Sequence, residues 1–242
     1  MRYSMKTDKG IVRESNQDNC YVTLFDDNSC FGVVCDGMGG PNAGDIASGI
    51  AVKEITDRFV EGFNADTSMQ DASVLLSKAI KKANLKILGL ATATPEYEGM
   101  GTTVVAFVCR GNELLIANVG DSRAYFVGEG LKQLTKDHSL VQEMIDKGEL
   151  KAEDAAAYPY KNIITRALGV DNHVDIDFYS YSFDGNCLLL CSDGLYNFVN
   201  AEKITGLVND TDIDFEDIAA ELITAANNNG GGDNITAVLV KR

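Results

Sequence analysis

Residues 102–134 read TTVVAFVCRGNELLIANVGDSRAYFVGEGLKQL, and this stretch decides the fold class. The apolar runs Thr102–Cys109 and Glu113–Val119 are separated only by the residues RGN. The runs Arg123–Val127 and Leu131–Leu134 are separated only by GEG. Connections this short, rich in glycine and asparagine, are typical of antiparallel hairpins and cannot hold the crossover helix of a parallel sheet. The middle of the chain is therefore predicted to form antiparallel sheet.

Strand patterns on either side extend this sheet. Tyr21–Phe25 and Cys30–Cys35 flank a turn at Asp26–Ser29, which predicts a hairpin. Val174–Phe183 and Cys187–Cys191 flank Asp-Gly-Asn, a type I′ turn signal that predicts another hairpin. A last strand is expected at residues 235–240.

Helical patterns lie between these strands. Apolar residues recur every three or four positions from Ile46 to Phe59 and from Leu76 to Leu90, which predicts two amphipathic helices. Two further helices are expected near Ser139–Lys147 and Phe215–Asn227. Hairpins and helices segregate instead of alternating, so we expect an α+β protein with antiparallel sheets and helices on the outer faces.

Composition limits the class of partner. The 242 residues include 21 Lys and Arg against 36 Asp and Glu, a formal net charge of −15. This excess of negative charge argues against a broad surface for nucleic acid or anionic membrane. The length and the 45% hydrophobic content are enough for a substantial buried core.

Targeting signals are not expected. Met1–Gly10 is polar, and the longest apolar run, Val104–Cys109, is far shorter than the ~20 residues of a membrane span. The six cysteines form no CxxC pair. We interpret them as buried, reduced thiols of a cytoplasmic protein.

Four aspartates share one local context. Asp36, Asp121, Asp193 and Asp233 each lie at the edge of a short apolar strand and beside a glycine. Carboxylates without a cluster of His or Cys suit hard cations such as Mg²⁺ or Mn²⁺. Asp-Gly is also a common turn dipeptide, so a single aspartate of this kind is more often part of a turn. On spacing alone both interpretations remain open.

Arg13 and the two histidines carry weaker signals. Arg13 precedes Asp18 by five residues, and an arginine beside a cation site is suited to hold a phosphoryl group with two hydrogen bonds. Taken by itself, an arginine in this context is more often a solvated surface residue. Two histidines, His138 and His173, exclude a His-rich zinc site and give little support to a Ser-His-Asp triad.

Seven motifs in a fixed order carry a family resemblance. They are Arg13–Asp18, Asp36–Gly40, Gly101–Thr103, Asn118–Arg123, Leu134–Ser139, Cys191–Leu195 and Gly232–Thr236. Together they resemble the metal-dependent protein phosphatases of the protein phosphatase 2C type, in their compact bacterial form. The resemblance runs from about residue 3 to residue 241. It implies a four-layer αββα sandwich of two antiparallel sheets flanked by helices. It also implies a single catalytic domain over residues 1–242, with a flap at about residues 146–168.

The resemblance also implies a set of metal ligands. Asp36 is expected to bridge two Mn²⁺ or Mg²⁺ ions, and Gly37 to offer its carbonyl to the second ion. Asp193 and Asp233 are expected to complete the first ion. Asp121, together with Asp193, is expected to hold a weaker third ion.

Catalytic roles follow from the same resemblance. Arg13 is expected to bind the substrate phosphate, and Asp18 to anchor water ligands of the metals. Asp36 and Asp193 are the metal ligands expected to act in catalysis. Two cations lower the pKa of a bridging water, which attacks phosphorus, so no cysteine or serine nucleophile is expected.

Two departures from the family pattern stand out. Many members have Glu where this chain has Gln17, and a neutral amide would weaken the second metal's water shell. Eukaryotic members carry a His, a proposed general acid, where this chain has Met38, and the His that often follows the bacterial motif is Pro41. A water on the metal is then expected to protonate the leaving group. His138 is an alternative donor, although a structural role in its turn is the simpler interpretation.

Three functions remain open at this point. The leading hypothesis is a monomeric, cytoplasmic phosphatase that acts on phosphoserine and phosphothreonine in proteins, a cognate serine/threonine kinase included. The second is a pseudophosphatase that binds phosphorylated partners without cleaving them, which the intact Asp36, Asp193 and Asp233 disfavour. The third is a hydrolase of small phosphoesters.

Overall fold

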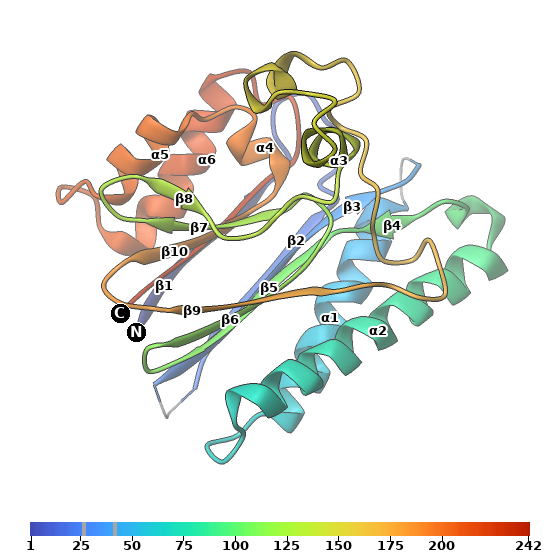
Figure 1. Cartoon of the computed structure of the whole chain (residues 1–242), viewed down its shortest axis with the longest axis horizontal. Coiled ribbons are helices and arrows are strands. Elements are labelled where there is room, and N and C mark those ends of the chain that lie inside the picture. Colours follow the sequence, from blue (N-terminus) through green and yellow to red (C-terminus); the bar gives the residue numbers. More distant parts are fainter. Residues whose placement is uncertain (26–27, 41–42) are drawn as a thin grey trace.

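Two antiparallel sheets pack face to face in the computed structural model, which describes residues 1–25, 28–40 and 43–242 (Figure 1). The first sheet has the order β1 (Arg2–Asp8), β11 (Ile235–Lys241), β10 (Cys187–Cys191), β7 (Arg123–Val127) and β8 (Leu131–Gln133). The second has the order β2 (Asp18–Leu24), β3 (Ser29–Met38), β5 (Val104–Arg110), β6 (Glu113–Val119) and β9 (Asp177–Ser182). The short strand β4 (Gly101–Thr102) pairs with β3.

Helices cover both outer faces of the sandwich. The helices α1 (Gly44–Gly62) and α2 (Met69–Ala93) pack on the second sheet, and α5 (Ala201–Val208) and α6 (Ile218–Asn228) pack on the first (Figure 1). The predicted α+β class and four-layer αββα arrangement are therefore confirmed. No helix in the described ranges has the length and apolar character needed to cross a membrane.

The core follows from the two-residue period of the strands. In β10, Leu188 and Leu190 face the other sheet, whereas Leu189 and Cys191 face the helices α5 and α6. Successive side chains of a strand point to opposite faces, so one apolar strand contributes to two buried layers at once. This explains why the central strands β5, β6, β10 and β11 are nearly continuous apolar runs and not alternating ones.

Most of the predicted hairpins are confirmed. The strand β5 pairs with β6 from Val104 opposite Val119, β7 pairs with β8, and β2 pairs with β3 from Asp18 opposite Asp36. The turn predicted at Asp26–Ser29 and the prediction for Pro41 fall on positions 26–27 and 41, which lie outside the described residues.

The hairpin predicted around Asp184–Asn186 is wrong. The strand β9 pairs with β6 in the second sheet, whereas β10 pairs with β7 and β11 in the first. The connection thus crosses from one sheet to the other. Phe183 lies at this crossing, fully buried, with its ring stacked parallel to that of Phe126 on β7 at 6.0 Å. Turn chemistry fixes the local bend, but it does not decide which sheet the next strand joins.

The segment after β8 returns to the sheet edge through the region predicted as a flap. The helix α3 (Leu140–Asp146) is capped by Ser139, whose side chain accepts a hydrogen bond from the amide of Gln142. The short 3-10 helix η2 (Ala152–Ala157) follows. An isolated bridge between Ser139 and Ile164 then brings the chain back beside its own start.

Candidate functional site

A cavity of about 300 Å³ lies at one edge of the sandwich. Its lining comes from segments spread along almost the whole chain: Arg13, Gln17, Asp36, Gly37, Met38, Gly39, Thr103, Asp121, Asn162, Ile164, Asp193, Asp233 and Asn234. All the residues predicted from the sequence as metal ligands are among them, and so is Arg13. Asp18 is not part of the lining, because it lies buried beneath it.

The strand ends place the carboxylates. Asp36 lies near the end of β3, and Asp121 follows the last residue of β6 by two positions, so both come from strands of the second sheet. Asp193 begins the short helix α4 (Asp193–Tyr196) after β10, and Asp233 precedes β11, so both come from the first sheet. The cavity therefore lies where the two sheets meet at their edge.

Threonines hold the backbone around Asp36. Thr103 Oγ1 accepts a hydrogen bond from the Asp36 amide at 2.9 Å, and its own amide donates to the Asp36 carbonyl at 2.9 Å. Thr102 Oγ1 donates to the same carbonyl at 2.8 Å. Both threonines are buried. The threonines of the Gly101–Thr103 motif thus fix the backbone that carries the Asp36 carboxylate, and they are not metal ligands themselves.

Close backbone packing explains two glycines of the site. A Cβ on Gly37 would lie 2.0 Å from the carbonyl oxygen of Gly44 and 2.6 Å from that of Gln17. A Cβ on Gly194 would lie 2.0 Å from the carbonyl oxygen of Asn234. No side chain fits at either position, because the obstructing atoms belong to backbone.

Asp18 is a buried carboxylate with one unused oxygen. Its Oδ2 accepts hydrogen bonds from Ser192 Oγ at 2.6 Å and from Thr236 Oγ1 at 2.7 Å. Its Oδ1 receives no hydrogen bond from any donor in the described residues. Burial raises the pKa of Asp18 to about 6, and the two hydroxyl donors oppose this rise.

Like charges crowd the cavity. Burial, then repulsion from Asp121 and Asp233, raises the pKa of Asp193 to about 8. Burial, then repulsion from Asp18 and Asp193, raises the pKa of Asp36 well above its usual range. Burial, with Asp137 next, raises the pKa of Asp121 to about 6. Carboxylates gathered in this way are unfavourable unless a cation neutralises them.

The donor set fits a hard divalent cation. Its atoms are the carboxylate oxygens of the lining aspartates and the backbone carbonyl of Gly37, and none is a nitrogen or sulfur. Across the described part of the chain, no three His, Cys, Asp or Glu side chains already form a metal cage. Carboxylate and carbonyl oxygens are the ligands that suit Mg²⁺ and Mn²⁺.

Arg13 lies at the mouth of the cavity. Its Nη2 forms an ion pair with Asp233 Oδ2 at 2.9 Å, and about half of its side chain is exposed (52%). The amides of Ile11 and Val12 donate to the carbonyl of Gly231, which fastens this N-terminal segment beside Asp233. The guanidinium is thus available to a ligand that enters from solvent.

The residues that depart from the family pattern also have clear places. Gln17 and Met38 both line the cavity, and Gln17 Nε2 donates to the carbonyl of Gly40 at 3.2 Å. His138 does not line it; its ring contacts Gly120, next to Asp121, and Asp177. The alternative role of His138 as a proton donor to a leaving group therefore has no support from its position.

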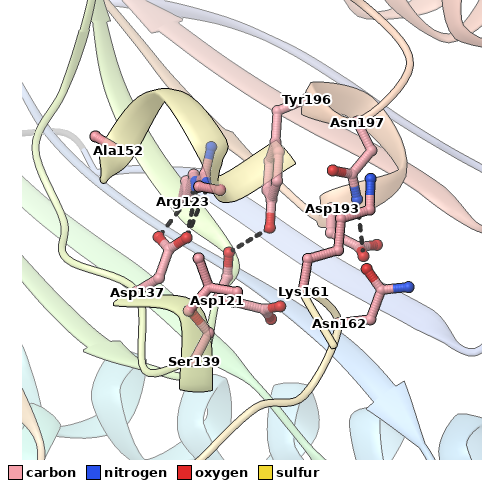
Figure 2. Close-up of a pocket in the computed structure, with 12 residues that line it drawn as sticks. Asp121, Arg123, Asp137, Ser139, Ala152, Lys161, Asn162, Asp193, Tyr196 and Asn197 are labelled. Atoms are coloured by element: carbon pink, nitrogen blue, oxygen red, sulfur yellow. Dashed lines mark hydrogen bonds and ion pairs between the residues drawn. The ribbon is translucent and has the colours of Figure 1, made fainter. Parts of the chain in front are cut away.

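A second cavity of about 340 Å³ adjoins the first (Figure 2). The two cavities share Asp121, Asn162 and Asp193. In the second, Arg123 forms an ion pair with Asp137 at 2.6 Å and lies 3.7 Å over the ring of Tyr196.

Tyr196 also holds the segment that carries Asp121. Its hydroxyl donates to the carbonyl of Asp121 at 3.1 Å (Figure 2). Sequence reasoning missed Tyr196. Arg123 and Asp137 lie in the motifs Asn118–Arg123 and Leu134–Ser139, but the sequence predicted no role for either residue.

The sequence of this chain is similar to those of known phosphatases. Residues 11–240 match the family model described as protein phosphatase 2C. A curated relative from Listeria welshimeri, "Serine/threonine phosphatase stp", is 41% identical over 100% of this chain and 96% of its own length.

Solved structures agree with this match. The crystal structure of the serine/threonine phosphatase Stp1 from Staphylococcus aureus superposes with a TM-score of 0.92. It is 35% identical and is matched over 99% of this chain and 94% of that chain. The catalytic domain of the phosphatase PstP, solved with two manganese ions, superposes with a TM-score of 0.84. It is 31% identical over 99% of this chain and 97% of its own.

Proposed function

The chain belongs to the protein phosphatase 2C family, and we propose that the cavity lined by Arg13, Asp36 and Asp193 is its active site. The protein is a metal-dependent serine/threonine protein phosphatase. The observation that carries the site assignment is the convergence of Arg13 and four aspartates, from both sheets, on one cavity at the sandwich edge.

Each carboxylate has a role in this proposal. Asp36, the carbonyl of Gly37, Asp193 and Asp233 would hold two divalent cations. Bound there, the cations would lower the pKa of a water and neutralise charge on the phosphoryl oxygens. Asp18 presents its unused Oδ1 toward a water ligand, a role supported by its burial and by the two hydroxyls that hold Oδ2.

Arg13 binds and orients the substrate phosphate. Its position at the cavity mouth, half exposed and next to Asp233, supports this role. A planar guanidinium can donate two parallel hydrogen bonds to a phosphate and hold phosphorus in line for attack by water.

No side chain is needed as a nucleophile. Cys35 and Cys191 precede the strand ends of the site, but both are fully buried, and burial raises their thiol pKa values well above the usual range. A thiol that stays protonated and out of contact with solvent is a poor nucleophile.

Three finer proposals accompany the site. Asp121 and Asp193 hold a weaker third ion, supported by their shared position between the two cavities. The enzyme works as a monomer in the cytoplasm, as a single catalytic domain with a flap at about residues 146–168; its free, mostly buried cysteines are consistent with a reducing compartment. Its substrates are phosphoproteins produced by a serine/threonine kinase, the kinase itself included.

Hydrolysis of a phosphothreonine peptide in Mn²⁺ tests the proposal. We expect Asp193→Ala to abolish turnover and Asp184→Ala, which changes an exposed carboxylate remote from the cavity, to leave it unchanged. Equal activity of the Asp193→Ala variant and wild type would refute the site. Binding of the phosphopeptide without turnover would instead indicate a pseudophosphatase. Higher catalytic efficiency on small phosphoesters would indicate the third candidate function.

A further inference from the structure

Gly120 forms the turn that delivers Asp121 to the cavity. Its φ of +103° lies in the left-handed region, and a Cβ at this position would lie 2.7 Å from Cβ of Thr103. The peptide between β6 and Asp121 therefore has an unusual conformation that its surroundings must hold in place.

His138 holds Gly120 through the peptide on each side of it. The Gly120 amide donates to Nδ1 of His138 at 2.9 Å, and the His138 amide donates to the Gly120 carbonyl at 3.0 Å. His138 is buried, with 7% of its surface exposed. A buried amide that lost this acceptor would have no water to replace it.

The hydrogen bonds fix the ring's tautomer. Because Nδ1 accepts from Gly120, it carries no proton, and the ring proton lies on Nε2. Asp177 Oδ2 lies 3.2 Å from Nε2 and can accept this proton. Arg166 Nη1, which can only donate, lies 3.1 Å from Nε2 without a hydrogen bond to it in this tautomer, and it donates to Asp177 Oδ1 at 2.9 Å. Burial lowers the pKa of His138, in keeping with a neutral ring.

We propose that His138 is a positioning residue for Asp121, acting through the acceptor Nδ1 that fixes the Gly120 peptide. The inference rests on the proposed role of Asp121 as a ligand of the third ion. The Nδ1 contact holds the Val119–Gly120 peptide, the His138 amide holds the Gly120–Asp121 peptide, and Tyr196 holds the carbonyl of Asp121. Loss of the Nδ1 acceptor frees the Val119–Gly120 peptide, so Gly120 can rotate and shift the carboxylate of Asp121.

Two substitutions separate the acceptor from the rest of the ring. In His138→Asn, the amide oxygen can occupy the place of Nδ1 and still accept from Gly120. In His138→Gln, the longer side chain reaches the place of Nε2 and can donate to Asp177, but it leaves the Gly120 amide without a partner.

Calorimetric titration with Mn²⁺ measures the consequence. For His138→Gln we expect the weakest site to bind about tenfold less tightly, the effect of one lost hydrogen bond, while the tighter sites stay unchanged. For His138→Asn we expect wild-type affinity at every site. Equal affinity of the Gln variant and wild type, or an equal loss in both variants, would overturn the inference.

Asp121→Asn separates failure of the inference from failure of the function. If this variant binds Mn²⁺ like wild type, the third-ion assignment falls and the inference falls with it. If it loses the weakest site but His138→Gln does not, only the positioning role is wrong.

The wild-type protein provides a test that no variant can confound. It has two histidines, so ¹⁵N NMR can assign the ring nitrogens of His138 directly. We expect a proton on Nε2 and none on Nδ1. A proton on Nδ1 would overturn the proposal even if His138→Gln failed to fold.

Discussion

Arg13 and Asp233 lie 220 residues apart in the sequence, yet their side chains form an ion pair of 2.9 Å at the mouth of the cavity. One residue is the proposed phosphate ligand and the other a proposed metal ligand. The contact uses a single nitrogen of the guanidinium, Nη2, and the side chain is half exposed. Because the guanidinium of Arg13 and the carboxylate of Asp233 are in contact, we expect the phosphate and the metal to bind beside each other.

Replacement of Arg13 should affect substrate binding more than turnover. We expect Arg13→Ala to raise KM for a phosphopeptide about tenfold or more, because a charge-assisted hydrogen bond contributes about 1.5–3 kcal/mol. The fall in kcat should be smaller. Steady-state kinetics at saturating Mn²⁺ measure both. Arg58→Ala, which removes an arginine paired with Glu54 on the outside of α1, is the control. A KM equal to that of wild type would reject the role.

Removal of the metal should reveal the repulsion among the aspartates. In the presence of EDTA we expect Asp193→Asn to raise the free energy of unfolding by at least about 1 kcal/mol, because it removes the cost of placing this carboxyl, whose pKa is raised to about 8, beside the other aspartates. Asn197 can still donate to the new amide oxygen as it does to Asp193 Oδ2.

Saturating Mn²⁺ should reverse the order, since only wild type binds the metals tightly and gains stability from them. Thermal melts with EDTA and with Mn²⁺ measure both effects, and Asp184→Asn controls for loss of an exposed charge. A metal-free Asp193→Asn protein that melts below wild type would contradict the account.

Two glycines offer a matched test of backbone packing. Gly194→Ala would place a Cβ 2.0 Å from the carbonyl of Asn234, so we expect a loss of about 3 kcal/mol or more, or failure to fold. Gly206 is exposed on α5, and a Cβ there would have no neighbouring atom within 4 Å. It should tolerate Ala with a gain of about 0.5–1 kcal/mol. Urea unfolding gives both values. Equal effects at the two positions would argue against the close contact.

His138 should make the protein sensitive to mild acid. Its pKa is lowered in the folded state by burial, whereas in the unfolded chain it titrates near its ordinary value of 6.5. The unfolded state therefore binds a proton first as the pH falls below that value, and stability declines until the folded ring is protonated as well. Above pH 6.5 the contribution is constant. Unfolding of His138→Asn should lack this part of the decline, and parallel pH profiles would contradict the prediction.

The hairpins and the two long helices could be predicted because their signals are local. Short glycine-containing connections and apolar periodicity specify β5 with β6, β7 with β8, α1 and α2 without reference to the rest of the chain. The carboxylates of the site were predictable because each lies beside a glycine at a strand end. The hairpin predicted at Asp184–Asn186 failed because β9 and β10 pair with distant strands in different sheets, β9 with β6 and β10 with β7 and β11.

The strand β1 was missed because its pattern is inverted. Its buried position is Ser4, while Tyr3 and Met5 are about 40% exposed. Ser4 is accepted in the core because its hydroxyl donates to the carbonyl of Glu216 at 2.7 Å and accepts from the amide of Ala219 at 3.0 Å, at the start of α6. These partners lie more than 200 residues away, so no local pattern could indicate them.

The pairing of β1 with β11 also bears on synthesis of the protein on the ribosome. Arg2 lies opposite Lys241, and the two ends of the chain lie side by side (Figure 1). The strand β1 is synthesised first, but it can pair only after β11 has been synthesised. The proposed ligand Asp233 lies just before β11, so it also becomes available late. A nascent or prematurely terminated chain would thus lack both a closed sheet and a complete set of ligands. Dephosphorylating activity is therefore expected only from a chain that includes β11.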